Sequence, residues 1–238
     1  MDLLMQPIVS HPLFGITLSV LTYVLCTALY RKTKTALLSP LPLTILIVCT
    51  FLLVFRIPFD EYNAGAQFIT LMLAPATVVL ALPLYENLSL IKENAAVILI
   101  SITIGTISSI ISVFLLCRTF GLDQVLTVSL IPKSVTTAIA VDISASMQGI
   151  RSVTVVAVIL SGVLGAVIGP TLCRLFRIQS SVAVGLAMGT AAHAVGASKA
   201  MEIGEKEAAM SGLAIGIAGL LTVVSAPVLV VLLTAIWQ

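Results

Sequence analysis

The stretch "LIPKSVTTAIAVDIS", Leu130 to Ser144, decides the fold, because it places a proline, a lysine, an aspartate and four hydroxyl side chains in a largely apolar chain. Proline lacks a backbone N–H and interrupts a helical hydrogen-bond ladder. A charge at membrane depth is costly unless protein or water surrounds it. The role of this stretch therefore depends on which solvent surrounds the chain.

The composition is that of an integral membrane protein. Of the 238 residues, 59% are hydrophobic and 9% are charged, and the mean hydropathy is +1.19. A soluble domain carries about 25% charged residues, and a soluble fold of this length could not hide so much apolar surface. The net charge of +2 and the lack of a basic tract give no indication of nucleic-acid binding.

Apolar runs near the bilayer-spanning length of about 20 residues recur along the chain. They cover residues 12–30, 40–57, 64–85, 95–117, 124–147, 152–175, 182–200 and 208–236. The loops between them are short, so we expect one all-α polytopic membrane domain over residues 1–238, with about six to eight transmembrane helices. Five of the spans, 95–117 among them, have the composition of ordinary lipid-embedded helices.

Three spans contain helix-breaking or polar residues: 64–85, 124–147 and 182–200. The first contains two prolines, the second contains Pro132 and Lys133, and the third is rich in glycine and alanine around His193. Irregular backbone at membrane depth is tolerated only where protein or a water-filled cavity surrounds it. We therefore expect these broken or re-entrant segments inside the bundle.

The positive-inside rule compares possible topologies. With 64–85 and 182–200 as re-entrant hairpins and 124–147 as a crossing, eight basic residues are cytoplasmic and three are outside, against seven and four for eight crossings. The hairpin arrangement places Arg118 and Arg174 inside and Arg151 outside. It also makes the two halves of the chain inverted repeats, although a weak echo between residues 75–87 and 132–144 pairs different segments.

Lys133 is the first candidate binding residue. It follows a proline that frees backbone carbonyls, and Ser134, Thr136 and Thr137 then provide hydroxyls at the start of a second half-helix. An ammonium group, hydroxyls and a helix N-terminus together suit a carboxylate. The alternative is that Lys133 extends to the interface while the hydroxyls bond along their own helix.

The segment from Gly189 to Ser198 is the second candidate. Its binding candidates are Gly189, Thr190, His193 and Ser198. His193 also suits proton coupling, because an imidazole titrates near neutral pH; the alternative is a packed, hydrogen-bonded core histidine. Asp142 is a further candidate for proton coupling, or else a helix-end residue near water, since it lies about 13 Å along a regular helix from Lys133.

The motifs of enzymes and metal sites are absent from the sequence. There is no GxSxG, HExxH or P-loop pattern, and the four cysteines lie in apolar runs without metal-ligand spacing. We therefore expect no catalytic residues, no metal and no cofactor.

Four stretches carry a family resemblance: "PATVVLALPLYEN", "IPKSVTTAIAVDIS", "LSGVLGAVIGP" and "RIQSSVAVGLAMGTAAHAVGASKAMEIGEKEAAMSGLAIGIAG". They resemble the LrgB/CidB family of bacterial antiholin-like membrane proteins, and the resemblance extends from about residue 12 to the C-terminus. It implies a multi-pass protein of the bacterial cell (inner) membrane, a homo-oligomer, with a small holin-like partner of the LrgA/CidA kind. Asp142 stands where relatives often have uncharged residues, so the resemblance implies no role for it.

The resemblance implies two functions. Family members are named as modulators of murein hydrolase activity and autolysis, and related members resemble carriers of small carboxylates such as pyruvate, glycolate and glycerate. The lysine beside a broken helix favours the second. We therefore expect a secondary transporter of small carboxylates of the pyruvate, lactate, glycolate or glycerate class, coupled to protons or cations; the alternative is an antiholin-like regulator of murein hydrolase export and cell lysis.

Overall fold

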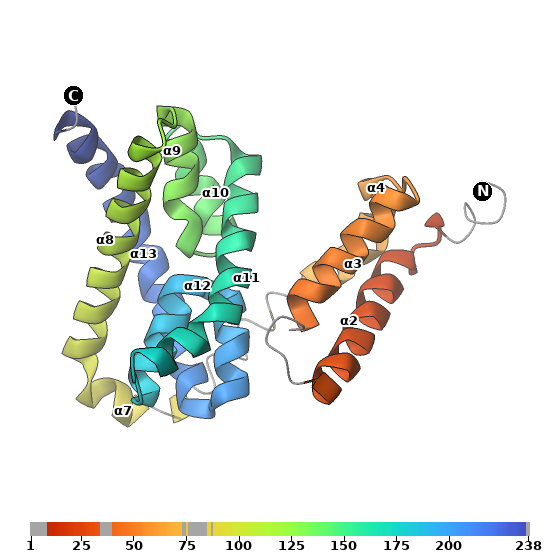
Figure 1. Ribbon diagram of the computed structural model, residues 1–238, viewed down its shortest axis with the longest axis horizontal. Coiled ribbons are helices and arrows are strands. Elements are labelled where there is room, and N and C mark those ends of the chain that lie inside the picture. The colour runs from red at the N-terminus through yellow and green to blue at the C-terminus, as the bar shows by residue number, and fades with distance from the viewer. Residues whose placement is uncertain (1–8, 34–39, 73–74, 76–84, 87, 237–238) are drawn as a thin grey trace. The chain divides into compact units, whose positions relative to one another are not determined.

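The computed structural model describes residues 9–33, 40–72, 75, 85–86 and 88–236. Every regular element in this part of the chain is helical (Figure 1), which confirms the predicted all-α class. Contacts divide the chain into two compact units, Met1–Val79 and Leu80–Gln238. The expectation of one membrane domain over the whole chain stays a prediction.

The first unit contains α2 (Phe14–Thr33), α3 (Pro40–Val54) and α4 (Phe59–Leu71). Helices α2 and α4 approach closely, because a side chain at Gly15 would overlap the backbone of α4. The hydroxyls of Ser19 and Tyr62 join the two helices at 2.7 Å. Half of the hairpin expected over 64–85, including residues 76–84, lies outside the described residues.

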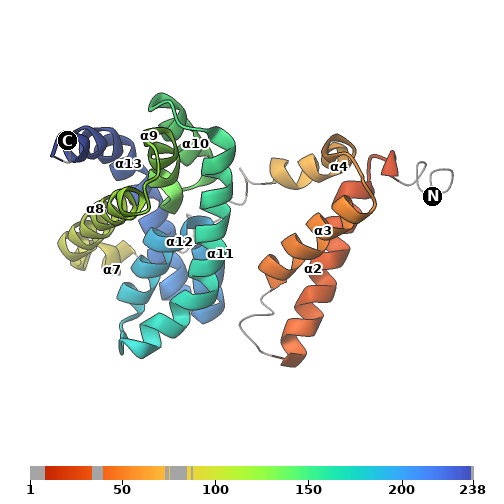
Figure 2. The same ribbon diagram turned by 45° about the horizontal axis from the view of Figure 1, so that its top comes forward.

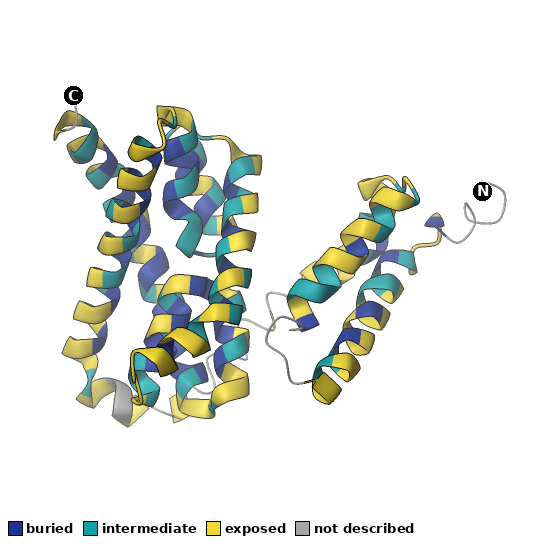
Figure 3. Ribbon diagram, in the orientation of Figure 1, coloured by how far each residue is buried: buried dark blue, intermediate teal, exposed yellow. Residues whose placement is uncertain are grey.

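The second unit is built around three long helices, α8 (Ala95–Thr119), α11 (Arg151–Leu175) and α13 (Glu205–Ile236), and the short α7 (Leu88–Glu93) precedes them. The 25 residues of α8 extend for about 37 Å at 1.5 Å per residue, which exceeds the roughly 30 Å of a bilayer core. Large apolar side chains are exposed on all three helices (Figure 3). These surfaces suit lipid contact.

A first hairpin connects α8 to α11. It consists of α9 (Gln124–Leu130), the 3-10 turn η2 (Ile131–Ser134) and α10 (Thr137–Ser146). The chain turns back towards the end at which it entered, because the Ile150 N–H donates to Ser129 Oγ at 2.7 Å and Thr154 Oγ1 donates to Ser144 Oγ at 2.7 Å. Each arm is too short to cross a bilayer core.

The crossing expected over 124–147 is therefore wrong. The segment enters and leaves at the same end of the bundle, so Arg118 at the end of α8 and Arg151 at the start of α11 lie on the same side (Figure 1). The reversal has a backbone cause, because Pro132 cannot donate a helical hydrogen bond. Val135 and Thr136 then adopt extended conformations before α10 begins.

A second hairpin is formed by α12 (Ser181–Ile203), which is broken at His193 with φ 42° and ψ −134°. A side chain at Gly196 would overlap the carbonyl of Met188, although these residues would be about 12 Å apart in a straight helix. Ala200 likewise packs in one cluster with Met188. The chain therefore doubles back at His193, which confirms the re-entrant segment expected over 182–200.

The two hairpins enter the second unit from opposite ends of α11. The first is tied to the beginning of α11 through Thr154, whereas Met188 of the second lies against Gly169, near the end of α11. Figure 2 shows α9 and α10 at one end of α11 and α12 towards the other. The inverted repeat expected between the two halves of the chain depends on 64–85, which the structure describes only in part.

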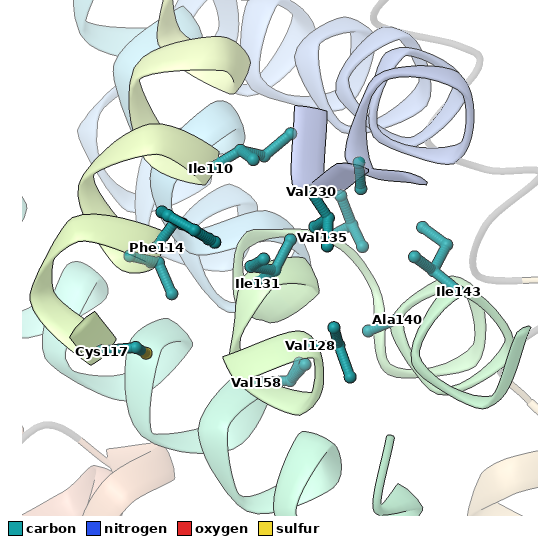
Figure 4. Packing of buried hydrophobic residues seen from close by; sticks show 12 residues of the cluster. Ile110, Phe114, Cys117, Val128, Ile131, Val135, Ala140, Ile143, Val158 and Val230 are labelled. Atoms are coloured by element: carbon teal, nitrogen blue, oxygen red, sulfur yellow. The ribbon is translucent and has the colours of Figure 1, made fainter. Parts of the chain in front are cut away.

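Both hairpins are embedded in apolar cores. The first packs in a cluster that includes Ile110 and Phe114 of α8, Ile131 of η2 and Val158 of α11 (Figure 4). A second cluster joins α8, α12 and α13. The irregular backbone of the tips is thus surrounded by protein, as the membrane interior requires.

Five described helices are long and apolar enough to cross a membrane: α2, α8, α11, α12 and α13. Helix α12 meets this criterion by its number of residues and its composition, but the reversal at His193 leaves two arms of which neither spans a bilayer core. The chain is a polytopic membrane protein in which long helices surround broken ones.

Candidate functional site

The two hairpin tips meet at the middle of α11, one turn of that helix apart. Ser161 Oγ donates to the backbone carbonyl of Lys133 at 2.6 Å, which satisfies an acceptor in the irregular tip. On the neighbouring turn, His193 Nε2 hydrogen-bonds to the carbonyl of Val158 at 3.0 Å. Helix α11 therefore fixes both breaks in position.

Lys133 lies deep in the bundle. It is the ninth residue after Gln124, the first residue of α9, and this corresponds to about 13 Å along a helix, close to half of a bilayer core. Its Nζ donates to Ser134 Oγ at 2.9 Å, and the hydroxyls of Ser134 and Ser109 lie 3.1 Å apart. The ammonium group is thus joined to α8 through two hydroxyls.

A cavity of about 700 Å³ opens beside this group, between α8, η2 and the first arm of α12. Its polar lining consists of one lysine, one asparagine and hydroxyl side chains: Asn94, Ser101, Ser108, Ser109, Ser112, Lys133, Ser134, Ser180 and Thr190. From Asn94 to Ser112 the cavity follows α8 for about 27 Å. It leads from one end of the bundle to the depth of Lys133.

The cavity has an unbalanced positive charge. No carboxylate lies among the lining residues, and within the described part of the chain no carboxylate pairs with Lys133. Glu202 of α12 instead pairs with Lys199 of the same helix at 2.6 Å. Lys133 is half-buried, and a charge partly removed from water without a counter-charge is unfavourable. The arrangement therefore suits a small anion that supplies the missing negative charge.

The structure separates the residues predicted around Lys133. Ser134 lines the cavity, but Thr136 and Thr137 do not. Thr136 is the N-cap of α10 without a side-chain capping bond, and Thr137 is exposed. The start of α10, which we expected to contribute to an anion site, is thus not part of the lining.

The predicted residues of α12 are separated in the same way. Thr190 lines the cavity, whereas Gly189 lies against Ser211 of α13, where a side chain would not fit. His193 is 4% exposed and faces α11, behind the lining. Ser198 is exposed and donates to the Ala194 carbonyl at 3.1 Å.

Asp142 lies outside the cavity lining as well. It is an exposed residue in the middle of α10. The roles of the predicted site residues in binding and coupling stay predictions, and the structure brings three of them, Lys133, Ser134 and Thr190, to one cavity.

A comparison with known protein families matches residues 19–232 to the LrgB-like family. The chain belongs to the LrgB-like family. It is 39% identical over 217 residues to the antiholin-like protein LrgB of Bacillus cereus strain B4264, and equally to that of Bacillus anthracis strain A0248; the aligned region covers 91% of this chain and 94% of each relative. No solved structure shows a significant match. The family resemblance expected from the sequence is thereby confirmed.

The serines of α8 belong to this site but were not predicted from the sequence. The span 95–117 was expected to be an ordinary lipid-embedded helix, yet four of its serines line the cavity: Ser101, Ser108, Ser109 and Ser112. The signal is present in "SITIGTISSIISV", residues 101–113, where the four serines recur at helical spacing along one face. The high mean hydropathy of the span 95–117 hid this stripe, the four serines that share one face of α8.

Proposed function

We propose that this LrgB-like protein is a secondary carrier of small carboxylates of the pyruvate, lactate, glycolate or glycerate class, located in the bacterial cell (inner) membrane. The observation that carries the proposal is the cavity whose charged lining residue is Lys133, at the break of a re-entrant hairpin. A carboxylate would neutralise the charge of the ammonium group and accept hydrogen bonds from neighbouring hydroxyls.

The arrangement of the hairpins supports a carrier. Secondary transporters place substrate sites near the bilayer midplane, where broken helices meet, and here the tips at Lys133 and His193 are both bonded to the middle of α11. We include in the proposal that transport is coupled to protons or cations, with His193 and Asp142 as candidates, and that the protein is a homo-oligomer without an enzymatic step of its own.

A second candidate function is that of an antiholin-like regulator of murein hydrolase export and cell lysis, acting with a small holin-like partner of the LrgA/CidA kind. The names of the relatives favour it, since they are antiholin-like proteins, and they support this function more directly than they support a carrier. The two candidates differ in whether the purified chain moves a carboxylate.

Reconstitution into proteoliposomes tests the choice. Uptake of radiolabelled pyruvate, lactate and glycolate would be measured with the protein alone, with the small partner alone and with both. Saturable uptake that requires this chain is the result expected of a carrier. If no carboxylate is taken up in any combination, while expression of the chain changes murein hydrolase activity in cells, the regulator is the correct function.

A further inference from the structure

We infer that Ser109 of α8 is a specificity-determining residue: with Ser134 and Lys133 it distinguishes carboxylates that carry an oxygen on the second carbon from those that do not. The inference rests on the proposed function and assigns the choice of substrate to a helix outside both hairpins. It follows from the three groups that are linked at the inner end of the cavity.

The hydrogen-bond inventory of this group leaves donors for a ligand. Lys133 Nζ has three N–H donors and uses one on Ser134 Oγ at 2.9 Å. The hydroxyls of Ser109 and Ser134 lie 3.1 Å apart and form one hydrogen bond with each other. One of their two protons is therefore already donated. Two ammonium donors and one hydroxyl donor therefore remain beside the cavity.

These donors match a carboxylate with an adjacent oxygen. The carboxylate accepts from the ammonium group, and a hydroxyl or oxo oxygen on the second carbon accepts from the remaining hydroxyl. Without that oxygen, a partly buried hydroxyl would lose its hydration on binding and gain no partner. Sites that hydrogen-bond a substrate oxygen reject analogues that lack it for this reason.

Ser109 differs from the other serines of the stripe in its partner. Its hydroxyl is bonded to Ser134 of the hairpin, whereas the Ser112 hydroxyl donates to the Ser109 carbonyl within α8. Ser101, Ser108 and Ser112 are also more exposed than Ser109. Of the four, Ser109 is the one that the structure joins to Lys133 through a hydrogen-bonded chain.

The test compares acids that differ by one oxygen. Binding of lactate against propionate, and of glycolate against acetate, would be measured by isothermal titration calorimetry on the full-length protein in detergent and by uptake into proteoliposomes. We expect the wild type to prefer the oxygenated acid of each pair by at least about tenfold. Ser109→Ala should reduce this preference about tenfold, a change that the loss of one hydrogen bond can produce. The affinity for propionate should change by less than about twofold.

Three variants make the result specific. Ser109→Thr retains the hydroxyl and should retain the preference, and Ser109→Cys, with a weak donor, should give an intermediate preference even if the alanine variant folds poorly. Thr103→Val removes a hydroxyl of α8 that bonds to the Leu99 carbonyl and does not line the cavity. This control should behave as the wild type.

The outcomes separate this inference from the function on which it rests. An unchanged preference in Ser109→Ala, or an equal loss of affinity for both acids of each pair, would overturn the role of Ser109 and leave a carboxylate carrier in place. If the wild type binds and transports none of the four acids, the carrier function fails and the inference fails with it.

Discussion

Lys133, a half-buried cation, has hydroxyl and backbone neighbours where a carboxylate would ordinarily lie. Its Nζ donates to Ser134, and its own carbonyl is held by Ser161. Placing a charge at membrane depth costs several kcal/mol unless water or a partner compensates. The 700 Å³ cavity beside it can admit both water and a ligand. We therefore expect a bound anion to neutralise the positive charge of Lys133.

Replacement of Lys133 tests this role. Lys133→Met should weaken carboxylate binding by at least about tenfold, because losing one partner of a desolvated charge pair typically costs about 2–5 kcal/mol. Lys133→Arg should retain part of the affinity, because the charge remains while the geometry differs. Calorimetric titration measures both effects. Normal transport by Lys133→Met, or failure of that variant to insert and fold, would make the lysine structural.

His193 presents a choice between coupling and packing. If it carries the coupled proton, His193→Gln should abolish accumulation against a gradient and leave substrate exchange partly intact in proteoliposomes. Its position favours a structural contribution in addition, since it is buried and bonded to the Val158 carbonyl. Unchanged accumulation together with a lower thermal midpoint would assign His193 to packing alone.

At the scale of the elements, the second hairpin depends on close contact between its arms. Gly196 faces the carbonyl of Met188, and a Cβ atom there would also lie 2.8 Å from that of Ala192. Since backbone atoms form the obstacle, the arms would have to separate to accept even a methyl group. The hairpin is thus specified by a glycine on one arm and small residues on the other.

Gly196→Ala should accordingly lower the thermal midpoint, with a destabilisation of about 1–3 kcal/mol, the usual cost of overpacking. Gly216→Ala is the matched control, because Gly216 lies in α13 with no neighbour within 4 Å of an added Cβ, and alanine is favoured over glycine in a helix interior. Differential scanning fluorimetry of both variants would measure the difference. Equal midpoints would show that the arms are not in contact.

The elements also show what a single sequence can predict. The break at Pro132 and the reversal within 182–200 were predictable, because proline, small residues and a histidine leave local marks in an apolar run. The direction of the chain after Pro132 was not predictable. It depends on a contact between Ser129 and Ile150, 21 residues apart in the sequence, and a 24-residue apolar span has the length to cross as well as to return.

For the second unit as a whole, the hairpins determine on which side each loop lies. Lys92, Arg174, Arg177, Lys199 and Lys206 lie towards one end, and Arg118 and Arg151 lie at the other. By the positive-inside rule, we expect the end with five basic residues to be cytoplasmic. We therefore expect the cavity, which begins at Asn94 and Ser180, to open on the cytoplasmic side.

Thiol labelling tests this topology. In a background with the four native cysteines replaced, Arg118→Cys and Arg151→Cys should both react with an impermeant reagent from outside the cell. Arg174→Cys should react only after permeabilisation. Labelling of positions 118 and 151 from opposite sides would contradict the first hairpin and restore a crossing over 124–147.

The depth of the cavity has an electrical consequence. Filled with water, the cavity would conduct, and the membrane potential would then fall mainly across the protein layer between Lys133 and the outer surface, about 13 Å, instead of across the full 30 Å of hydrocarbon. One elementary charge that moves through the whole potential gains about 2.3 kcal/mol per 100 mV. Under the proposed carrier function, a carboxylate that passes Lys133 without its coupled proton or cation would cross most of the electric field in one short movement, and that step would depend on voltage.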